Sequence, residues 1–280
     1  MSRPRASAGS TRLRQEFAKI GFVVLRNVLG EAQVDALRSE LTRIFDAPST
    51  YPGDINEHTN YKRAYFDPLN RYASLTGLPF QPALVAALRE LLGDDFLFLP
   101  EAAIHDRGYG GWHKDTTSQE VAGLRFHREA DFRIVQCALY LQENHPLYGG
   151  GIDVIVGSHR NRDRIVPQSK VWPISLVSRA LYKLKSLDDN RRGRTVSTAA
   201  GDVVIFDYRL DHRATPARVS TIPEAHRKFA FFIVASANDR HARAYRRYIQ
   251  SRPDYVYLKG YETSPALAAE AKRASVGLLD

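Results

Sequence analysis

The sequence is poor in cysteine and in long apolar runs. Cys137 is the only cysteine among 280 residues, so no disulfide can form within the chain. The longest apolar stretch, residues 229–237, has about half of the roughly 20 residues that a membrane-spanning helix needs. The basic segment 1–15 lacks the apolar centre of a secretory signal. These absences predict no membrane span, a reducing compartment and a cytoplasmic location.

Several motifs that mark common activities are also missing. The sequence has no GxGxxG after a strand pattern, no GxxxxGKS or GxxxxGKT, no GxSxG and no CxxC pair. The glycine-rich residues 108–111 and 149–151 lack the strand–turn–helix context of a phosphate-binding loop. The sequence therefore favours neither a nucleotide-binding loop nor a serine hydrolase.

Acidic residues are outnumbered, with 31 Asp and Glu against 40 Lys and Arg and a net charge of +9. Local basic excess occurs at residues 3–14, 191–194 and 240–252, but none of these runs alternates regularly with aromatic residues as a base-stacking groove does. Nucleic-acid binding is therefore not expected. The basic clusters at 61–63 and 160–164 favour a small, anionic substrate.

Composition and element order predict one globular domain. The hydrophobic fraction of 44% and the charged fraction of 25% are ordinary for a soluble globular chain. Helical patterns come first and short, evenly spaced strands follow, which is typical of a mainly β fold with flanking helices (α+β) around a double-stranded β-helix, or jelly-roll, core. The expected division is a mobile tail at 1–10 and a single domain at 11–280, with a helical flank 11–94, a β-core 95–237 and a C-terminal helix and tail 238–280.

Apolar periodicity places the individual elements. Residues spaced three or four apart predict helices, and those expected are Thr11–Ile20, Leu29–Ala47, Leu84–Leu92, Ser175–Leu187 and Asn238–Ile249. Short β-rich runs between turn residues predict strands, and those expected are Gly21–Leu25, Phe96–Leu99, Phe132–Leu141, Ile152–Val156, Asp202–Tyr208 and Lys228–Ala235. The stretch 48–82 is rich in turn residues and in aromatic residues, and no individual element is predicted there.

One pattern of His and Asp residues points to metal chemistry. His113 and Asp115 are two residues apart, and His212 follows 99 positions after the first histidine. On a strand, residues i and i+2 emerge from the same face, and two imidazoles with one carboxylate can occupy one face of Fe(II). The HxD spacing alone arises easily by chance. The HxE pair His127 and Glu129 is a rival, disfavoured because it lies in a charged stretch before a strand.

The chain resembles the phytanoyl-CoA dioxygenase-like family of Fe(II)/2-oxoglutarate oxygenases over nearly its whole length. Four blocks occur in the family order: the GFVVL strand with the following helix, the WHKD segment, the strand and glycine-rich block 131–159 ending in Gly-Ser-His, and the GDVVIF strand before His212. Val156 stands where the family usually has proline.

The resemblance implies roles for particular residues. His113, Asp115 and His212 are identified as the iron ligands. The family holds the 2-oxoglutarate carboxylate with an arginine on the strand after the distal histidine, and a guanidinium grips a carboxylate in bidentate fashion. Arg227, which opens a strand 15 residues after His212, is preferred over Arg218 in the preceding loop.

Two further residues are weaker candidates for contacts with 2-oxoglutarate. They are Gln136 on the central strand and Thr215, three residues after His212. Each is equally consistent with an ordinary strand or turn residue.

The expected activity is hydroxylation of an unactivated C–H bond, with Fe(II), 2-oxoglutarate and O₂ as cofactors, succinate and CO₂ as products and ascorbate as a candidate reductant. Halogenating relatives carry Ala or Gly at the carboxylate position, so Asp115 indicates a hydroxylase. The alternatives are a metal-dependent cupin-like isomerase or hydrolase and a catalytically silent jelly-roll binding protein.

Overall fold

Two antiparallel sheets form the jelly roll. The computed structural model describes residues 8–59, 62–107, 111–161, 184 and 187–279. The larger sheet has the order β1-β8-β5-β10-β4-β3-β2, with β11 pairing in parallel with β4, and the smaller sheet has the order β7-β6-β9. The strands are β1 (Phe22–Leu25), β2 (Ile55–Thr59), β3 (Lys62–Phe66), β4 (Leu97–Asp106), β5 (Ile134–Tyr140), β6 (Ile152–Val154), β7 (Arg194–Thr195), β8 (Val203–Asp207), β9 (His212–Ala214), β10 (Phe229–Ser236) and β11 (Gly277–Leu278).

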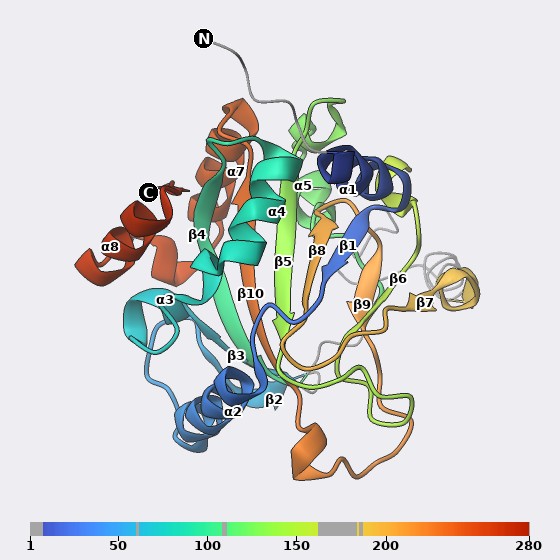
Figure 1. The fold of residues 1–280 in the computed structure, drawn as a ribbon, viewed down its shortest axis with the longest axis vertical. Helices are drawn as coiled ribbons and strands as arrows, with labels where there is room; N and C mark the ends of the chain where they lie inside the picture. The colour runs from blue at the N-terminus through green and yellow to red at the C-terminus, as the bar shows by residue number, and fades with distance from the viewer. Residues whose placement is uncertain (1–7, 60–61, 108–110, 162–183, 185–186, 280) are drawn as a thin grey trace, which may run out of the picture.

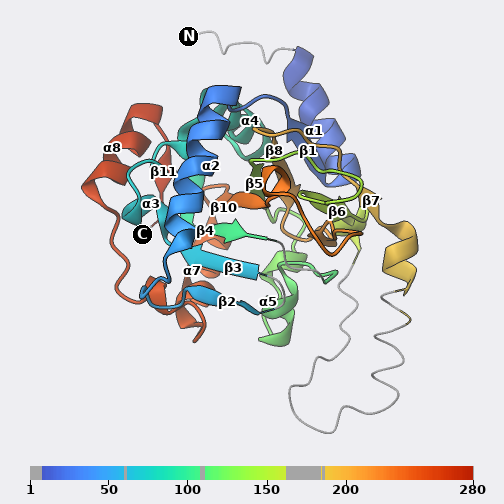
Figure 2. The same ribbon diagram turned by 90° about the horizontal axis from the view of Figure 1, so that it is seen from below.

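Helices cover the outer face of the larger sheet. In Figure 1, α4 lies in front of the central strands, and Figure 2 shows α2 running along the same sheet. The described α-helices are α1 (Ala8–Ile20), α2 (Glu31–Asp46), α3 (Pro68–Arg71), α4 (Pro82–Leu92), α5 (Thr117–Val121), α7 (Arg240–Ser251) and α8 (Pro265–Ala274), and the short 3-10 helices are η1 (Leu78–Phe80), η2 (Phe126–Arg128), η3 (Ser158–Arg160), η4 (Glu224–His226) and η5 (Val256–Leu258).

The alternation along β10 separates the two faces of the larger sheet. Phe229, Phe231 and Ile233 belong to the core cluster that also contains the buried side chains of α2 and α4. Ala230, by contrast, belongs to the cluster between the two sheets, and Phe232 packs against that cluster. Because successive strand residues point to opposite faces, every residue of β10 can be assigned to the helix-covered face or to the inner face between the sheets.

Gly149 shapes the loop between β5 and β6. Its φ is +65°, in the left-handed region, and a Cβ atom there would lie 2.3 Å from the carbonyl oxygen of Thr215. Only glycine fits this conformation beside that backbone. The loop can therefore approach the end of β9, close to the distal histidine.

The sheet centre contains the sole cysteine. Cys137 lies in β5, paired with Ile233 of β10 on one side and Ile205 of β8 on the other. The side chain is buried, and burial raises the pKa of its thiol. A buried thiol with a raised pKa is poorly reactive.

The fold class expected from the sequence is confirmed, with differences in individual elements. β4 extends to Asp106, beyond the predicted end at Leu99, and the stretch 48–82 contributes β2 and β3 at one side of the larger sheet. The first helix begins at Ala8, inside the predicted tail, and α8 was not predicted. The helix expected at Ser175–Leu187 lies largely outside the described residues.

Candidate metal centre

Two backbone hydrogen bonds join the segments that carry the two candidate histidines. The amide of His113 donates to the carbonyl of His212 at 3.0 Å, and the amide of His212 donates back at 2.9 Å. This is an isolated antiparallel bridge, whereas the sequence predicted a strand around His113. The ring centroids lie 4.3 Å apart. A single bridge therefore brings together two residues that are 99 positions apart.

Asp115 completes the cluster from the turn that precedes α5. Its Oδ1 lies 3.7 Å from Nε2 of His113 and 3.9 Å from Nε2 of His212. Donor atoms of the three residues all lie within 4.8 Å of one another. Two imidazole nitrogens and one carboxylate oxygen form the donor set of a facial 2-His-1-carboxylate iron site. The structure thus brings the three predicted ligands together.

The remaining ring nitrogen of each histidine contacts a backbone carbonyl. Nδ1 of His113 lies 2.8 Å from the carbonyl oxygen of Gly111, and Nδ1 of His212 lies 3.0 Å from that of Leu210. A carbonyl only accepts hydrogen bonds, so each Nδ1 carries the proton and each Nε2 presents its lone pair. Both rings are therefore held in the tautomer that binds a metal toward Asp115.

Burial sets the protonation state of His212. The side chain packs against the ring of Phe206, with centroids 4.6 Å apart. Desolvation lowers the pKa of His212 to about 4, and the hydrogen bond to Leu210 opposes the shift only in part. The imidazole is consequently neutral near pH 7, which is the form that coordinates metal ions.

Lys114 fixes the ligand segment from its opposite side. Its ammonium donates to the carbonyls of Ser158 at 2.9 Å and Asn161 at 2.8 Å, and it lies 3.9 Å from the carboxylate of Asp211. The side chain is buried. This lysine connects the HxD segment to the turn at η3 and to the residue before His212. The sequence analysis assigned no role to Lys114, which lies between two candidate ligands and points away from them.

Gln136 and Thr215 occupy different environments. Gln136 is a partly buried residue of β5 opposite Phe206, whose ring contacts the distal histidine. The hydroxyl of Thr215 donates to Asp153 at 2.8 Å and accepts from Asn144 at 3.0 Å. Gln136 thus neighbours Phe206, which packs against His212, while the hydroxyl of Thr215 is already engaged within the smaller sheet.

Neither arginine considered as the cosubstrate anchor lies with the triad. The guanidinium of Arg227 contacts both carboxylate oxygens of Asp106, at 3.1 and 3.0 Å, and Glu224 at 3.1 Å. It also stacks over Phe229, 4.8 Å from the ring centroid, on the helix-covered face. Arg218 is exposed in the loop after β9. The structure therefore places Arg227 on the face of the larger sheet opposite to the metal-ligand cluster.

One carboxylate surrounded by three tyrosine hydroxyls lies near Asp115, and the sequence did not reveal it. Glu101 of β4 accepts hydrogen bonds from the hydroxyls of Tyr245 and Tyr255, and from Tyr208 at 3.4 Å. Burial raises the pKa of Glu101, with a smaller contribution from the charge of Asp115. The three tyrosines come from widely separated segments, so local sequence patterns carry no signal for this contact.

The rival HxE pair does not converge on one point. His127 is buried and its Nε2 lies 2.7 Å from Glu120, whereas Glu129 contacts Arg240 and lies 3.2 Å from His241. Glu129 and His241 belong to a second group of possible metal donors, but its carboxylates are already paired with Arg240. This group is therefore an ion-pair network between α7 and the segment that precedes β5.

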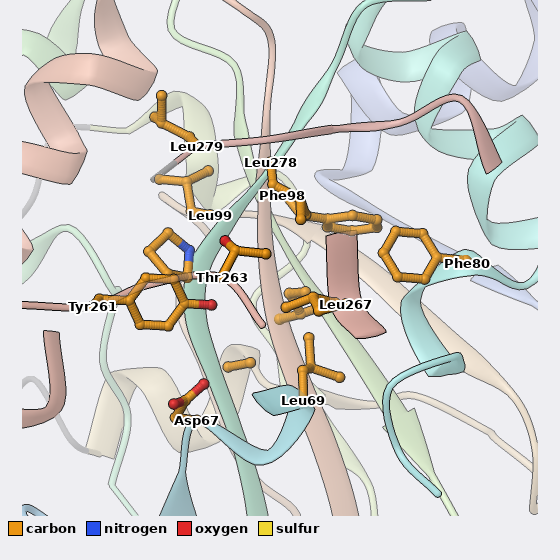
Figure 3. A pocket seen from close by; sticks show the side chains of 13 residues that line it. Asp67, Leu69, Phe80, Phe98, Leu99, Tyr261, Thr263, Leu267, Leu278 and Leu279 are labelled. Atoms are coloured by element: carbon orange, nitrogen blue, oxygen red, sulfur yellow. The ribbon is translucent and has the colours of Figure 1, made fainter. Parts of the chain in front are cut away.

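A separate apolar pocket lies between α8 and the larger sheet (Figure 3). Its lining includes Phe98, Leu267 and Leu278. The enclosed volume of about 10 Å³ corresponds to roughly one water molecule. The pocket is too small for an organic substrate and reflects incomplete packing of the C-terminal helix.

The jelly roll and the His-Asp-His site together define a class, the iron- and 2-oxoglutarate-dependent oxygenases. A family model, "Phytanoyl-CoA dioxygenase (PhyH)", matches residues 17–221, which include all three predicted ligands. The match covers almost three quarters of the sequence. The chain belongs to this family, as its sequence predicted.

Curated relatives and solved structures agree with this family. An ectoine dioxygenase from Nocardia farcinica is 26% identical over 70% of this chain and 69% of its own length. An ectoine dioxygenase from Bordetella bronchiseptica is 23% identical over 90% and 83%. The fold resembles that of HygX from Streptomyces hygroscopicus, solved with nickel and 2-oxoglutarate, with a TM-score of 0.59 and 16% identity over 83% and 88% of the two chains.

No helix in the described part of the chain is long and apolar enough to span a membrane.

Proposed function

We propose that this oxygenase hydroxylates an unactivated C–H bond of a small metabolite, consuming 2-oxoglutarate and O₂ and releasing succinate and CO₂. The observation that carries the proposal is the convergence of His113, Asp115 and His212, with both histidines held in the metal-binding tautomer. Such an arrangement costs desolvation of polar groups that a purely structural cluster need not bear. It favours a working metal centre over a silent binding protein.

The donor set fits Fe(II). His113 and His212 would hold the ion through neutral nitrogens, and Asp115 through an anionic oxygen. Three protein ligands leave the other positions of a six-coordinate ion open to 2-oxoglutarate and O₂. When bound, the iron supplies the oxidising chemistry, and the chain contributes ligand geometry and a partly enclosed site. Gln136, opposite Phe206 of β8, would contact the bound cosubstrate.

The carboxylate of Asp115 supports hydroxylation as the outcome. Halogenating relatives have Ala or Gly at this position, which leaves room for chloride on the iron. Here Asp115 Oδ1 faces both histidines, so the position is filled by the protein. We therefore assign the proposed activity to hydroxylation and not to halogenation.

The substrate is proposed to be a small polar molecule. Relatives are named ectoine dioxygenases, and a HygX structure contains hygromycin B. The expected preference for an anionic substrate depended in part on Arg63, but this guanidinium lies 3.7 Å from Asp106 and stacks over Phe45 on the helix-covered face. Glu101 lies within electrostatic reach of Asp115. An anionic group of the substrate would therefore bind away from the metal ligands.

Succinate formation tests the proposal directly. The purified protein, supplied with Fe(II), ascorbate, 2-oxoglutarate and O₂, should release succinate even without substrate, because uncoupled turnover consumes the cosubstrate. His113→Ala should abolish this release and leave the fold intact. His145→Asn is the matched control, because this partly exposed histidine contacts only its own loop and His226. A metabolite screen for products heavier by one oxygen atom then identifies the substrate.

Each outcome discriminates between the possible functions. Metal binding without succinate formation would indicate a metal-dependent isomerase or hydrolase of the same fold. Loss of both would indicate a binding protein. Full activity of His113→Ala would contradict the assignment of the metal ligands.

A further inference from the structure

One cation points from β10 into the space between the two sheets. Lys228 immediately precedes β10, one residue after Arg227, and therefore points to the opposite face. Its ammonium donates a hydrogen bond to the carbonyl oxygen of Thr215 at 3.0 Å. Thr215 follows β9 in the smaller sheet, so the lysine side chain crosses from one sheet to the other.

The environment of this ammonium is short of partners. In the part of the chain that the structure describes, the carbonyl of Thr215 is its one hydrogen-bond acceptor, although an ammonium carries three donors. Burial lowers the pKa of Lys228 to about 8, and the negative charge of Asp153 offsets only part of that shift. The carboxylate of Asp153 is itself engaged by Thr195, Thr215 and Arg213.

A second polar group on the same inner face also lacks a partner. Tyr140 of β5 pairs with Ala230 of β10, two residues from Lys228, and so shares its face. The side chain is 3% exposed, and no described residue hydrogen-bonds its hydroxyl. Desolvation alone raises the pKa of this phenol, so it remains a hydrogen-bond donor. The hydroxyl is therefore available to a ligand that enters between the two sheets.

The position along β9 relates this pair to the metal ligands. Thr215 follows His212 by three residues, which corresponds to roughly 10 Å of extended backbone. The inner face thus carries the candidate metal donors at one point, and the ammonium of Lys228 lies against the backbone just beyond the other end of β9. This spacing suits a short ligand with an anionic group at each end.

We propose that Lys228 and Tyr140 bind the carboxylate of 2-oxoglutarate that does not chelate the metal. The inference rests on the proposed function, since it assumes that 2-oxoglutarate is the cosubstrate. It assigns to Lys228 the role that the family resemblance implied for Arg227. The guanidinium of Arg227 already grips Asp106 on the other face of the sheet.

Anaerobic binding measurements test this assignment without relying on turnover. The protein loaded with Ni(II) is titrated by calorimetry with 2-oxoglutarate and with 2-oxopentanoate, which has the same chain but lacks the distal carboxylate. The wild type should prefer 2-oxoglutarate by at least about 30-fold, since a buried charge-assisted contact to a carboxylate is involved. Lys228→Met should remove this preference, and Lys228→Arg should retain much of it.

Two further variants locate the contact. Arg227→Met is the matched control and should keep the preference for 2-oxoglutarate. Tyr140→Phe should lower it by roughly 5-fold, the effect of one hydrogen bond. Circular dichroism and thermal midpoints establish that each variant is folded. If Lys228→Met does not fold, the preference for 2-oxoglutarate over 2-oxopentanoate is compared among Tyr140→Phe, Arg227→Met and the wild type. A preference that falls in Tyr140→Phe and stays in Arg227→Met supports the assignment, and the opposite pattern overturns it.

The possible failures are distinguishable. A wild type that binds 2-oxoglutarate no better than 2-oxopentanoate, or a preference lost in Arg227→Met and kept in Lys228→Met, would overturn this inference and leave the proposed function standing. A wild type that binds neither ligand would overturn the proposed function and, with it, the inference.

Discussion

At the scale of single residues, His212 combines two independent constraints. Burial keeps the imidazole neutral, and the hydrogen bond from Nδ1 to Leu210 fixes which nitrogen is available. His113 has the equivalent hydrogen bond to Gly111. Metal binding near pH 7 therefore requires no change of tautomer in either ring, and the charge of the donor set comes from Asp115 alone.

Replacing Asp115 with Ala should lower the affinity for Ni(II) or Fe(II) by more than about 100-fold, because even the loss of an indirect supporting contact costs 10–100-fold. Asp115→Asn should fall between this variant and the wild type, since an amide oxygen remains without the charge. Anaerobic metal titration measures the affinities, and urea unfolding of the metal-free proteins provides the control. An unchanged affinity in Asp115→Ala would remove Asp115 from the ligand set.

The binding of 2-oxoglutarate should weaken as the pH rises through about 8. The pKa of Lys228 is lowered to about 8 by burial, so its ammonium is charged below that pH and neutral above it. Only the charged form attracts a carboxylate, and the bound anion moves the transition upward. The surrounding groups are Asp153 of β6 and the phenol of Tyr140 of β5.

Calorimetric titrations between about pH 7 and pH 10 measure this dependence. The range extends roughly one unit below the midpoint and two units above it. Lys228→Arg should bind with little dependence on pH in that range, because a guanidinium stays protonated. A flat profile in the wild type would show that Lys228 does not contact the cosubstrate.

At the scale of elements, the HxD segment is held by side-chain contacts and not by a regular strand. One backbone bridge connects it to β9, and Lys114 anchors it to the turn at η3. Asp211 is attached to the same turn, because its backbone amide donates to the hydroxyl of Ser158 at 2.8 Å. The turn at η3 therefore positions both ligand segments.

Lys114→Met should destabilise the protein and lower its metal affinity together. The substitution removes two charge-assisted hydrogen bonds, to the carbonyls of Ser158 and Asn161, each worth about 1.5–3 kcal/mol. Urea unfolding and metal titration measure the two effects. Lys272→Met, at an exposed position of α8, is the control and should change neither. A stable variant with normal metal affinity would show that the turn is held by other contacts.

The sequence predicts most strands because apolar runs between turn residues are clear, as in β5, β8 and β10. It does not predict which face of β10 carries a given residue. Residues 229–235 are apolar on both faces, so no alternation distinguishes them, and the 3-10 turn at η4 hides where the extended backbone begins. Arg227 is predicted at the site because the family uses an arginine on this strand, and the sequence pattern does not show which face of the sheet that residue occupies.

The candidate metal ligands are predictable for a different reason. His113 and Asp115 are close in sequence, and the family blocks identify His212 as their partner. Glu101 and Lys114 carry no such signal, because their contacts come from segments distant in sequence and depend on the completed fold. Edge strands such as β2 and β7 escape prediction because they are short and polar.

At the scale of the whole molecule, the segment beyond the family match completes the larger sheet. Residues 222–280 supply β10, α7, α8 and β11. β11 pairs in parallel with the start of β4, and Arg89 of α4 donates to the carbonyls of Ala274 and Ser275. The C-terminal segment is thus attached both to the sheet and to the helix layer.

Leu267→Ala should lower the free energy of unfolding by about 2–5 kcal/mol, because the side chain is 2% exposed and lies in the main core cluster. It lines the small pocket of Figure 3, which would enlarge. Urea unfolding of the metal-free protein measures the change, and Ala268→Ser, exposed on the same helix, should stay close to the wild type. A loss below about 1 kcal/mol would mean that α8 contributes little to the common core.

The single buried cysteine allows the opening of the native protein to be followed by the modification of one thiol. A thiol-specific reagent reaches Cys137 only when the helix-covered core opens, because the side chain is 2% exposed and packs in the cluster beneath α2 and α4. The rate of modification in native buffer therefore measures how often the helix layer or the strands around β5 separate. No background from other thiols needs to be removed by mutagenesis. If modification slows when metal and 2-oxoglutarate are added, binding at the inner face is energetically coupled to the opening of the core on the other face of the sheet.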